Sequence, residues 1–222
     1  MNSTHMKMAR EQRTRGAGIR GAGEASGEVA KRRYTMRARA AATDATRARV
    51  LDCAYELILS CSYEELTLRR VAERAGVTFQ TVLRHFGSKD GLIAAVAETH
   101  GRAESDRRRV RAGDTRGAAR VLVARYEETG DALLRWEQLE DRVAVIADGL
   151  RLARAGHAAW LEQTFADALA RTHGRARQVL LAELYAATDI NTWRLWRRHL
   201  GLTRREAETA MHHLLDALVG DQ

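Results

Sequence analysis

The 222-residue sequence contains no proline, only two cysteines and no long apolar run. Without proline, and with many arginine, alanine, leucine and glutamate residues, the chain favours helices over a turn-rich β-architecture. No apolar stretch is long enough to span a membrane, and the N-terminus lacks the hydrophobic core of a signal peptide. We therefore expect an all-α protein that lies in the cytoplasm and has no membrane partner.

The two cysteines, Cys53 and Cys61, lie eight residues apart on or just beyond the first expected helix. This separation along a helix axis is too large for a disulfide within the chain. Two interpretations remain open. Each cysteine is a small apolar residue of the core, or one of them is a thiol that senses oxidants.

The net positive charge of the chain comes from its first 50 residues and is absent from the rest. Residues 1–50 hold 12 Lys or Arg against 4 Asp or Glu, whereas residues 51–222 hold 25 of each kind. Residues 1–42 are rich in Gly, Ala, Arg and Ser without helical periodicity, which predicts a flexible basic N-terminal arm. Five basic residues of this arm could contact DNA phosphates, enter a minor groove or simply be solvated. They are Lys31, Arg32, Arg33, Arg37 and Arg39.

No group of residues carries an evident reaction or metal site. The eight histidines include no HExxH motif, and no arrangement of Ser, His and Asp follows from their spacing. The sequence therefore predicts no catalytic residue, no metal ligand and no cofactor, and we do not expect an enzyme.

A helix-turn-helix is predicted between Leu66 and Leu92. Its first helix would run over residues 68–74 with Thr67 as N-cap, and it would end at Gly76, because glycine adopts the left-handed conformation without strain. The second helix would begin after Thr78 and expose amide, hydroxyl and arginine side chains, which suit base edges in a major groove. This pattern predicts a DNA-binding domain.

A more specific pattern lies within this motif. It consists of Ala75, Gly76, Val77, Thr78, Thr81, His85, Phe86, Gly87, Ser88, Lys89, Asp90 and Leu92. The pattern resembles the signature of the tetracycline-repressor (TetR) family of bacterial transcriptional regulators, and the similarity covers roughly residues 46–96. The family usually has a phosphate-contacting tyrosine where this chain has Leu83, and a small residue where it has Gln80. We therefore expect that phosphate anchor to be missing and Leu83 to pack.

The resemblance implies a homodimer that places its two second helices in successive major grooves of a palindromic operator. Within that helix we expect Gln80 to read a base, because an amide can form paired hydrogen bonds with adenine. Phe79 and Arg84 could contact either bases or phosphates. The residues that we assign mainly to phosphate are Thr67, Thr78, Thr81, His85 and Lys89.

The expected domain boundaries follow from the helical patterns on either side of the motif. Residues 43–98 would form a three-helix DNA-binding domain, and its fourth helix would begin at Ser88 and continue as a connector to about residue 112. Residues 113–222 would form a helical bundle for ligand binding and dimerisation. The apolar face of the first helix is expected to comprise Val50, Ala54, Leu57, Ile58 and Cys61.

Several amphipathic helices are predicted in the C-terminal part. Their ranges are 116–129, 131–139, 141–155, 157–172, 175–200 and 203–219, with Gly130, Gly156, Gly174 and Gly201 as breaks. The range 175–200 is apolar on more than one side, and 203–219 carries an apolar stripe, which indicates a four-helix interface between two chains. Alternatively, both helices only close the core of their own chain.

All four tryptophans lie in this C-terminal part. Aromatic side chains with one polar atom suit ligand cavities, so we expect an apolar effector pocket there. Ordinary core packing is the alternative for each of these side chains. The residues expected at the pocket are Tyr126, Trp136, Trp160 and Trp193, with Asp189 as a polar contact.

Together these features predict a cytoplasmic, nucleoid-associated transcriptional regulator. It would be a repressor that a small-molecule effector of unknown identity releases from a double-stranded DNA operator. Two other classes remain open, an architectural DNA-binding protein without a ligand and a helical-bundle enzyme. A palindromic footprint that a small molecule relieves would exclude both.

Overall fold

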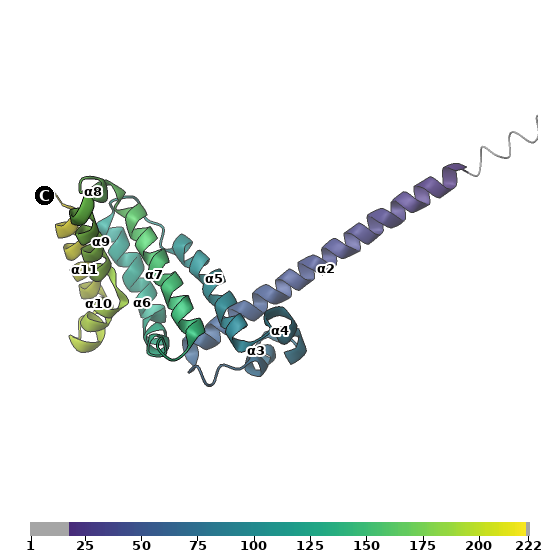
Figure 1. Ribbon diagram of the computed structural model, residues 1–222, viewed down its shortest axis with the longest axis horizontal. Coiled ribbons are helices and arrows are strands. Elements are labelled where there is room, and N and C mark those ends of the chain that lie inside the picture. The colour runs from purple at the N-terminus through teal and green to yellow at the C-terminus, as the bar shows by residue number, and fades with distance from the viewer. Residues whose placement is uncertain (1–17, 221–222) are drawn as a thin grey trace, which may run out of the picture. The chain divides into compact units, whose positions relative to one another are not determined.

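The computed structural model describes residues 18–220, and it describes side chains from residue 36 onward (Figure 1). All regular elements of this described part are helical, which confirms the predicted all-α class. The chain divides into two compact units, Met1–Ala48 and Arg49–Gln222. None of the described helices is both long enough and apolar enough to cross a membrane.

The helices follow one another along the chain and are labelled in Figure 1. They are α2 (Gly18–Ser60), α3 (Leu68–Ala75), α4 (Phe79–Phe86), α5 (Lys89–Arg107), α6 (Thr115–Glu137), α7 (Ala144–Thr164), α8 (Ala166–Ala170), α9 (Gly174–Thr188), α10 (Ile190–Arg194), the π-helix η1 (Leu195–His199) and α11 (Arg204–Val219).

Helix α2 begins at Gly18, whereas the sequence predicted a flexible arm to residue 42 and a helix only from residue 43. Residues 1–17 of that arm, and the side chains of Lys31, Arg32 and Arg33, lie outside the described part. The side chains of residues 36–45, which include Arg37 and Arg39, are exposed. Alanine and arginine favour a helix here without an apolar face, so the apolar periodicity could not indicate it.

The C-terminal half of α2 supports the helix-turn-helix through its apolar face. All five residues predicted for this face are buried, as expected, and they pack with Val71, Val82 and Leu92. Burial raises the pKa of the thiols of Cys53 and Cys61. Since the thiolate is the reactive form, this favours the apolar interpretation of the cysteines over a thiol sensor.

The core of the helix-turn-helix extends beyond residue 98, where we expected its domain to end. Trp136 of α6 and Ile146 of α7 are buried in the same apolar cluster as the helix-turn-helix residues. The ring of Tyr63 meets the Trp136 ring edge-on, with 5.7 Å between the ring centroids. Residues 43–98 therefore share their core with the C-terminal part of the chain.

A second apolar cluster fills the C-terminal bundle between α6, α7, α9 and α11, with Trp193 completely buried. The predicted breaks at Gly130 and Gly156 are wrong, because α6 and α7 continue through them. Gly130 serves packing instead. A Cβ atom at this position would lie 2.5 Å from Cζ3 of Trp193.

The predicted single helix over residues 175–200 is also wrong, since three elements occupy that range. The backbone leaves the helical conformation at Asp189, with ψ of 147°. The Asp189 carboxylate accepts a hydrogen bond from the Asn191 N–H at 2.8 Å and so caps α10. The last helix begins as its sequence indicates, with Thr203 and Glu206 in a reciprocal capping box.

Candidate nucleic-acid interface

The turn between α3 and α4 is fixed by caps at both helices. The Thr67 hydroxyl accepts a hydrogen bond from the Arg70 N–H at 3.2 Å at the start of α3. Gly76 ends α3 with φ of 64°, a left-handed conformation that favours glycine. The Val77 N–H then donates to the Ala72 carbonyl at 3.0 Å, which closes the helix end. This is the geometry predicted for the helix-turn-helix.

Helix α4 buries one side and exposes the other. Val82 and Phe86 are buried, Leu83 is half-buried as expected for a packing residue, and Gln80 and Arg84 are exposed. The helix therefore presents an amide and a guanidinium to solvent, and both groups can bond to base edges or phosphates.

Three threonine hydroxyls at this surface already serve the backbone or one another. The Thr78 hydroxyl accepts from the Thr81 N–H at 3.2 Å, and the two hydroxyl oxygens lie 2.9 Å apart. Thr67 caps α3 in the same way. The Thr67 hydroxyl can still donate its own hydrogen to a phosphate, and so can whichever of the Thr78 and Thr81 hydroxyls accepts the bond between them.

Lys89, which the sequence analysis assigned to a phosphate contact, is half-buried against Tyr63. Its ammonium group donates to the Tyr63 carbonyl and lies 3.4 Å from the centroid of the Tyr63 ring. Burial lowers the pKa of Lys89. A phosphate contact by Lys89 would therefore require its side chain to turn outward.

The arginines of the motif differ in their partners. Arg74 forms an ion pair with Glu56 at 2.6 Å. The Arg69 guanidinium lies 5.8 Å from the ring centroid of Phe79, which is 37% exposed. Arg84 forms no hydrogen bond or ion pair with any residue that the structure describes. Unlike Arg69 and Arg74, which belong to α3, it lies on α4. The ring of half-buried His85 lies beside that of Phe86.

Three of the residues predicted for an effector pocket, Tyr126, Trp160 and Trp193, are buried in the core of the C-terminal bundle. Their polar atoms already have protein partners. Tyr126 Oη donates to the Thr188 carbonyl at 2.9 Å, Trp160 Nε1 to the Arg108 carbonyl at 2.8 Å, and Trp193 Nε1 to Glu127 Oε1 at 2.8 Å. This arrangement favours ordinary core packing for these side chains.

The other two predicted pocket residues lie elsewhere. Trp136 belongs to the apolar cluster of the helix-turn-helix, and Asp189 caps α10. The structure therefore does not bring the five residues together in one site. The prediction grouped Trp136 with the others because a sequence shows that a residue is aromatic but not which of two neighbouring cores contains it.

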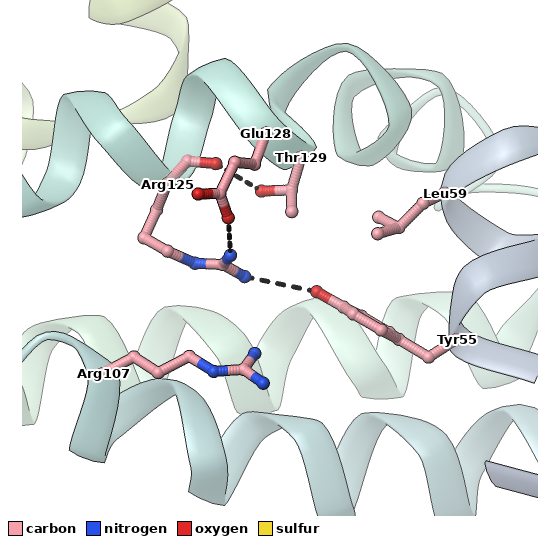
Figure 2. Close-up of a pocket in the computed structure, with 6 residues that line it drawn as sticks. All are labelled: Tyr55, Leu59, Arg107, Arg125, Glu128 and Thr129. Carbon is pink, nitrogen blue, oxygen red and sulfur yellow. Dashed lines mark hydrogen bonds and ion pairs between the residues drawn. The ribbon is translucent and has the colours of Figure 1, made fainter. Parts of the chain in front are cut away.

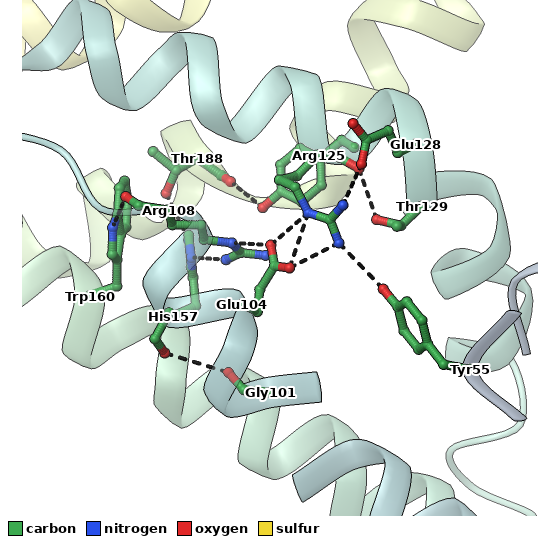
Figure 3. A network of polar contacts seen from close by, with 12 residues as sticks. Tyr55, Gly101, Glu104, Arg108, Arg125, Glu128, Thr129, His157, Trp160 and Thr188 are labelled. Carbon is green, nitrogen blue, oxygen red and sulfur yellow. Dashed lines mark hydrogen bonds and ion pairs between the residues drawn. The ribbon is translucent and has the colours of Figure 1, made fainter. Parts of the chain in front are cut away.

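A polar network that the sequence did not reveal joins α2, α5 and α6 (Figure 3). Glu104 Oε1 accepts from Arg108 Nε at 2.7 Å and from Arg125 Nε at 3.0 Å. Arg125 also pairs with Glu128 and donates to Tyr55 Oη at 3.3 Å. The sequence shows only the local spacings of Glu104 with Arg108 and of Arg125 with Glu128, since the contacts of Arg125 with Glu104 and Tyr55 join separate helices.

The network continues to His157 of α7. Arg108 Nη1 lies 3.3 Å from His157 Nδ1, and His157 Nε2 lies 2.9 Å from the hydroxyl of Thr188. Burial, together with the charge of Arg108, lowers the pKa of His157 to about 4. Burial opposes ionisation of Glu104, but its bonds with Arg125 and Arg108 outweigh this and lower its pKa. At neutral pH the histidine is therefore neutral and the glutamate is charged.

Two open grooves adjoin these elements, and none of the five predicted pocket residues lines either one. The groove in Figure 2 has a volume of about 510 Å³ and is lined by Tyr55, Leu59, Arg107, Arg125, Glu128 and Thr129. The other, of about 310 Å³, follows one face of α9 and is lined by Arg175, Gln178, Val179, Ala182, Glu183 and Ala186. Among the described residues, no group of three or more His, Cys, Asp or Glu is placed to hold a metal ion.

Comparison with known proteins identifies the N-terminal part of this fold. The family model described as "Bacterial regulatory proteins, tetR family" matches residues 50–96, from the second half of α2 into α5. No protein with curated annotation has a significantly similar sequence.

Solved structures share the fold over most of the chain. A putative TetR-family transcriptional regulator from Rhodococcus sp. is 16% identical with a TM-score of 0.60, and the match covers 79% of this chain and 99% of that one. A tetR-family transcriptional regulator from Streptomyces coelicolor is 19% identical with a TM-score of 0.61, covering 78% and 81%. The SmeT–triclosan complex is 18% identical with a TM-score of 0.57, covering 78% and 91%.

Proposed function

Because the chain is a DNA-binding transcriptional regulator with a tetR-family domain at residues 50–96, we propose that it is a homodimeric repressor of a palindromic operator. A small-molecule effector would release it from the DNA. The observation that carries this proposal is α4, a capped helix that presents Gln80 and Arg84 to solvent. The protein would act in the cytoplasm, where bacterial operators lie.

The proposed DNA contacts follow from what each side chain offers. Gln80 would read a base pair in the major groove, and Phe79 and Arg84 would contact base edges or phosphates. The residues proposed to position the helix on the backbone are Thr67, Thr78, Thr81, His85 and Lys89. Of these, Lys89 would have to leave its place against Tyr63 when DNA binds.

The proposed dimer interface comprises α9, η1 and α11. Four large apolar side chains in this region are exposed, and exposed apolar patches mark interaction surfaces. They are Val179, Leu195, Leu200 and Leu214. Much of the stripe predicted on α11 packs within its own chain, since Ala207 and Met211 are completely buried. The proposed interface is therefore narrower than the sequence indicated.

The proposed response to an effector draws on the shared fold. One structure with this fold is a complex of SmeT with triclosan. In this chain a ligand would release DNA only if it bound the DNA-free conformation of the dimer more tightly than the DNA-bound one. A pocket at Tyr126, Trp160 and Trp193 would have to open, because these side chains are packed.

Selection of duplex DNA from a random library by the purified protein tests the proposal. We expect enrichment of an inverted repeat whose half-site centres lie roughly one helical turn, or about 34 Å, apart. Enrichment of single half-sites would contradict the dimeric mode of binding. Binding without sequence preference would instead indicate an architectural protein.

The response to a ligand is tested by reciprocity. A compound that quenches the tryptophan fluorescence of the protein must bind less tightly when the enriched operator is present. Binders whose affinity does not change with operator would contradict the proposed release.

A further inference from the structure

The groove between α2, α5 and α6 has the dimensions of a small-ligand site. Its volume of about 510 Å³ falls within the range of roughly 300–1,000 Å³ that is typical of such sites. Leu59 and the ring of Tyr55 supply an apolar wall, and Arg107, Arg125 and Glu128 supply charge (Figure 2).

The charges around this groove leave one cation unbalanced. Arg108 and Arg125 are balanced by Glu104 and Glu128, with which they form ion pairs. Arg107 forms no hydrogen bond or ion pair with any residue in the described part of the chain. The lining of the groove therefore attracts an anion, and it does so through Arg107.

Arg125 cannot take this role without losing bonds that it already makes. Its Nε and Nη2 atoms bind Glu104, Nη1 binds Glu128, and Nη2 also reaches Tyr55 Oη. The Arg107 guanidinium is unengaged and can form two parallel hydrogen bonds with a carboxylate.

Glu128 limits the charge that the groove accepts. Its side chain is 63% exposed and lines the groove together with Arg107. A second negative charge on a ligand would find no further unpaired cation in the lining, which already carries this carboxylate. The groove thus suits a single negative charge joined to an apolar body.

We propose that this groove binds a small organic carboxylate with an apolar tail. The carboxylate pairs with Arg107, and the tail packs against Leu59 and Tyr55. Such a ligand contacts two helices at once, α5 through Arg107 and α2 through Leu59 and Tyr55, and α2 supports the helix-turn-helix. The proposed ligand would then be the effector, and its chemical class would be that of an apolar carboxylate. That the groove is a regulatory site rests on the proposed function.

Calorimetric titration of the full chain without DNA tests the assignment, with octanoate as probe and octanol as its neutral counterpart. We expect octanoate to bind at least tenfold more tightly than octanol, and octyl phosphate to bind more weakly than octanoate. Arg107→Gln should weaken octanoate binding at least tenfold and leave octanol binding unchanged. The matched control is Arg102→Gln, an exposed arginine of α5 that pairs with Glu98 away from the groove, and it should bind octanoate like the unaltered protein.

Two results would overturn the assignment. Octanoate that fails to bind, or that binds Arg107→Gln as tightly as the unaltered protein, would show that Arg107 is only a solvated arginine at the end of α5. Because no DNA is present, the titration is independent of operator recognition. A protein that binds octanoate through Arg107 but selects no DNA sequence would contradict the proposed function and leave the groove assignment standing.

Discussion

The indole N–H of Trp136 donates a hydrogen bond to the carbonyl oxygen of Ile58 at 3.0 Å. This bond joins α6 to the end of α2 and is buried between them. Trp136 is only 6% exposed, and it completes the core of the helix-turn-helix from the C-terminal part of the chain. The bond therefore ties the DNA-reading element to the bundle that we propose to dimerise.

Trp136→Phe should lower the free energy of unfolding by about 1–3 kcal/mol, because it leaves the Ile58 carbonyl without this donor and opens space in the core. Urea denaturation followed by circular dichroism measures the loss. The control is Trp196→Phe, since the half-buried Trp196 makes no side-chain hydrogen bond within the described part of the chain. Equal losses in the two variants would show that the bond to Ile58 contributes nothing.

Gln80→Ala should relax base preference at one position of each half-site, with a loss of discrimination of roughly 1–3 kcal/mol. Competition binding between the selected operator and single-base variants measures this change. Gln163→Ala, which removes an exposed amide on α7, should leave the preference unchanged. A Gln80→Ala protein that bound every sequence more weakly by the same factor would contradict a base-reading role.

Val179→Asp should convert the proposed dimer into a monomer at low micromolar concentration, because the substitution places a charge in the proposed apolar interface. Light scattering coupled to size-exclusion chromatography reports the mass. The control is Leu152→Asp, at a leucine of α7 that is also exposed, with 51% exposure against 42% for Val179. If Leu152→Asp alone dissociates the dimer, the interface lies on α7 rather than on α9.

Acid should destabilise the protein through His157. Its pKa is about 4 in the folded chain and 6.5 without the fold, so the unfolded chain binds more protons between these values. The free energy of unfolding should therefore fall as the pH falls from 6.5 to 4, with at most about 3 kcal/mol from this residue. Urea denaturation across this range measures the slope.

His157→Gln is the variant that assigns this slope. It should flatten the pH dependence between 6.5 and 4, although not completely, because burial also lowers the pKa of His100. Arg125 and Arg108 hold the pKa of Glu104 below its ordinary value, so the stability that its ionised form provides is lost as the pH falls below that ordinary value, at the acid end of this range. An unchanged slope in His157→Gln would mean that His157 is accessible to protons in the folded protein.

Gly130→Ala should destabilise the protein by about 1–3 kcal/mol, because the new methyl group would overlap the buried ring of Trp193. Gly156→Ala provides the matched control inside another helix. No atom lies within 4 Å of its added Cβ, so it should stabilise the protein by about 0.5–1 kcal/mol through helix propensity alone. Thermal denaturation of the two variants should show shifts of opposite sign.

The N-terminal caps of four helices were the part of the fold that the sequence predicted best. Thr67, Thr78, Ser88 and Thr203 cap the helices that they were expected to begin or precede, because a cap needs only a side chain and a backbone N–H a few residues away. The same local chemistry places an N-cap at Asp189, whose carboxylate we had assigned to a ligand.

The contacts between distant segments could not be predicted in this way. Gly130 looks like a helix break until Trp193, 63 residues later, occupies the space beside it. Arg125 looks like a surface residue until Glu104 and Tyr55 approach from two other helices. In each case the deciding partner lies far along the chain, and neither periodicity nor spacing indicates which side chains will meet.

Trp136 and Ile146 cover the core of the helix-turn-helix. This limits how a DNA-binding segment can be exchanged between regulators of this kind. A DNA-reading segment that ends at residue 98 lacks both side chains. Transplanted onto a foreign bundle, it would keep the exposed face of α4 but would uncover the side of its core that these two residues bury. If α4 reads the operator as we propose, substitutions on α4 would change operator specificity without disturbing this shared core, whereas exchange of the whole segment would need a bundle that brings its own tryptophan to the Ile58 carbonyl.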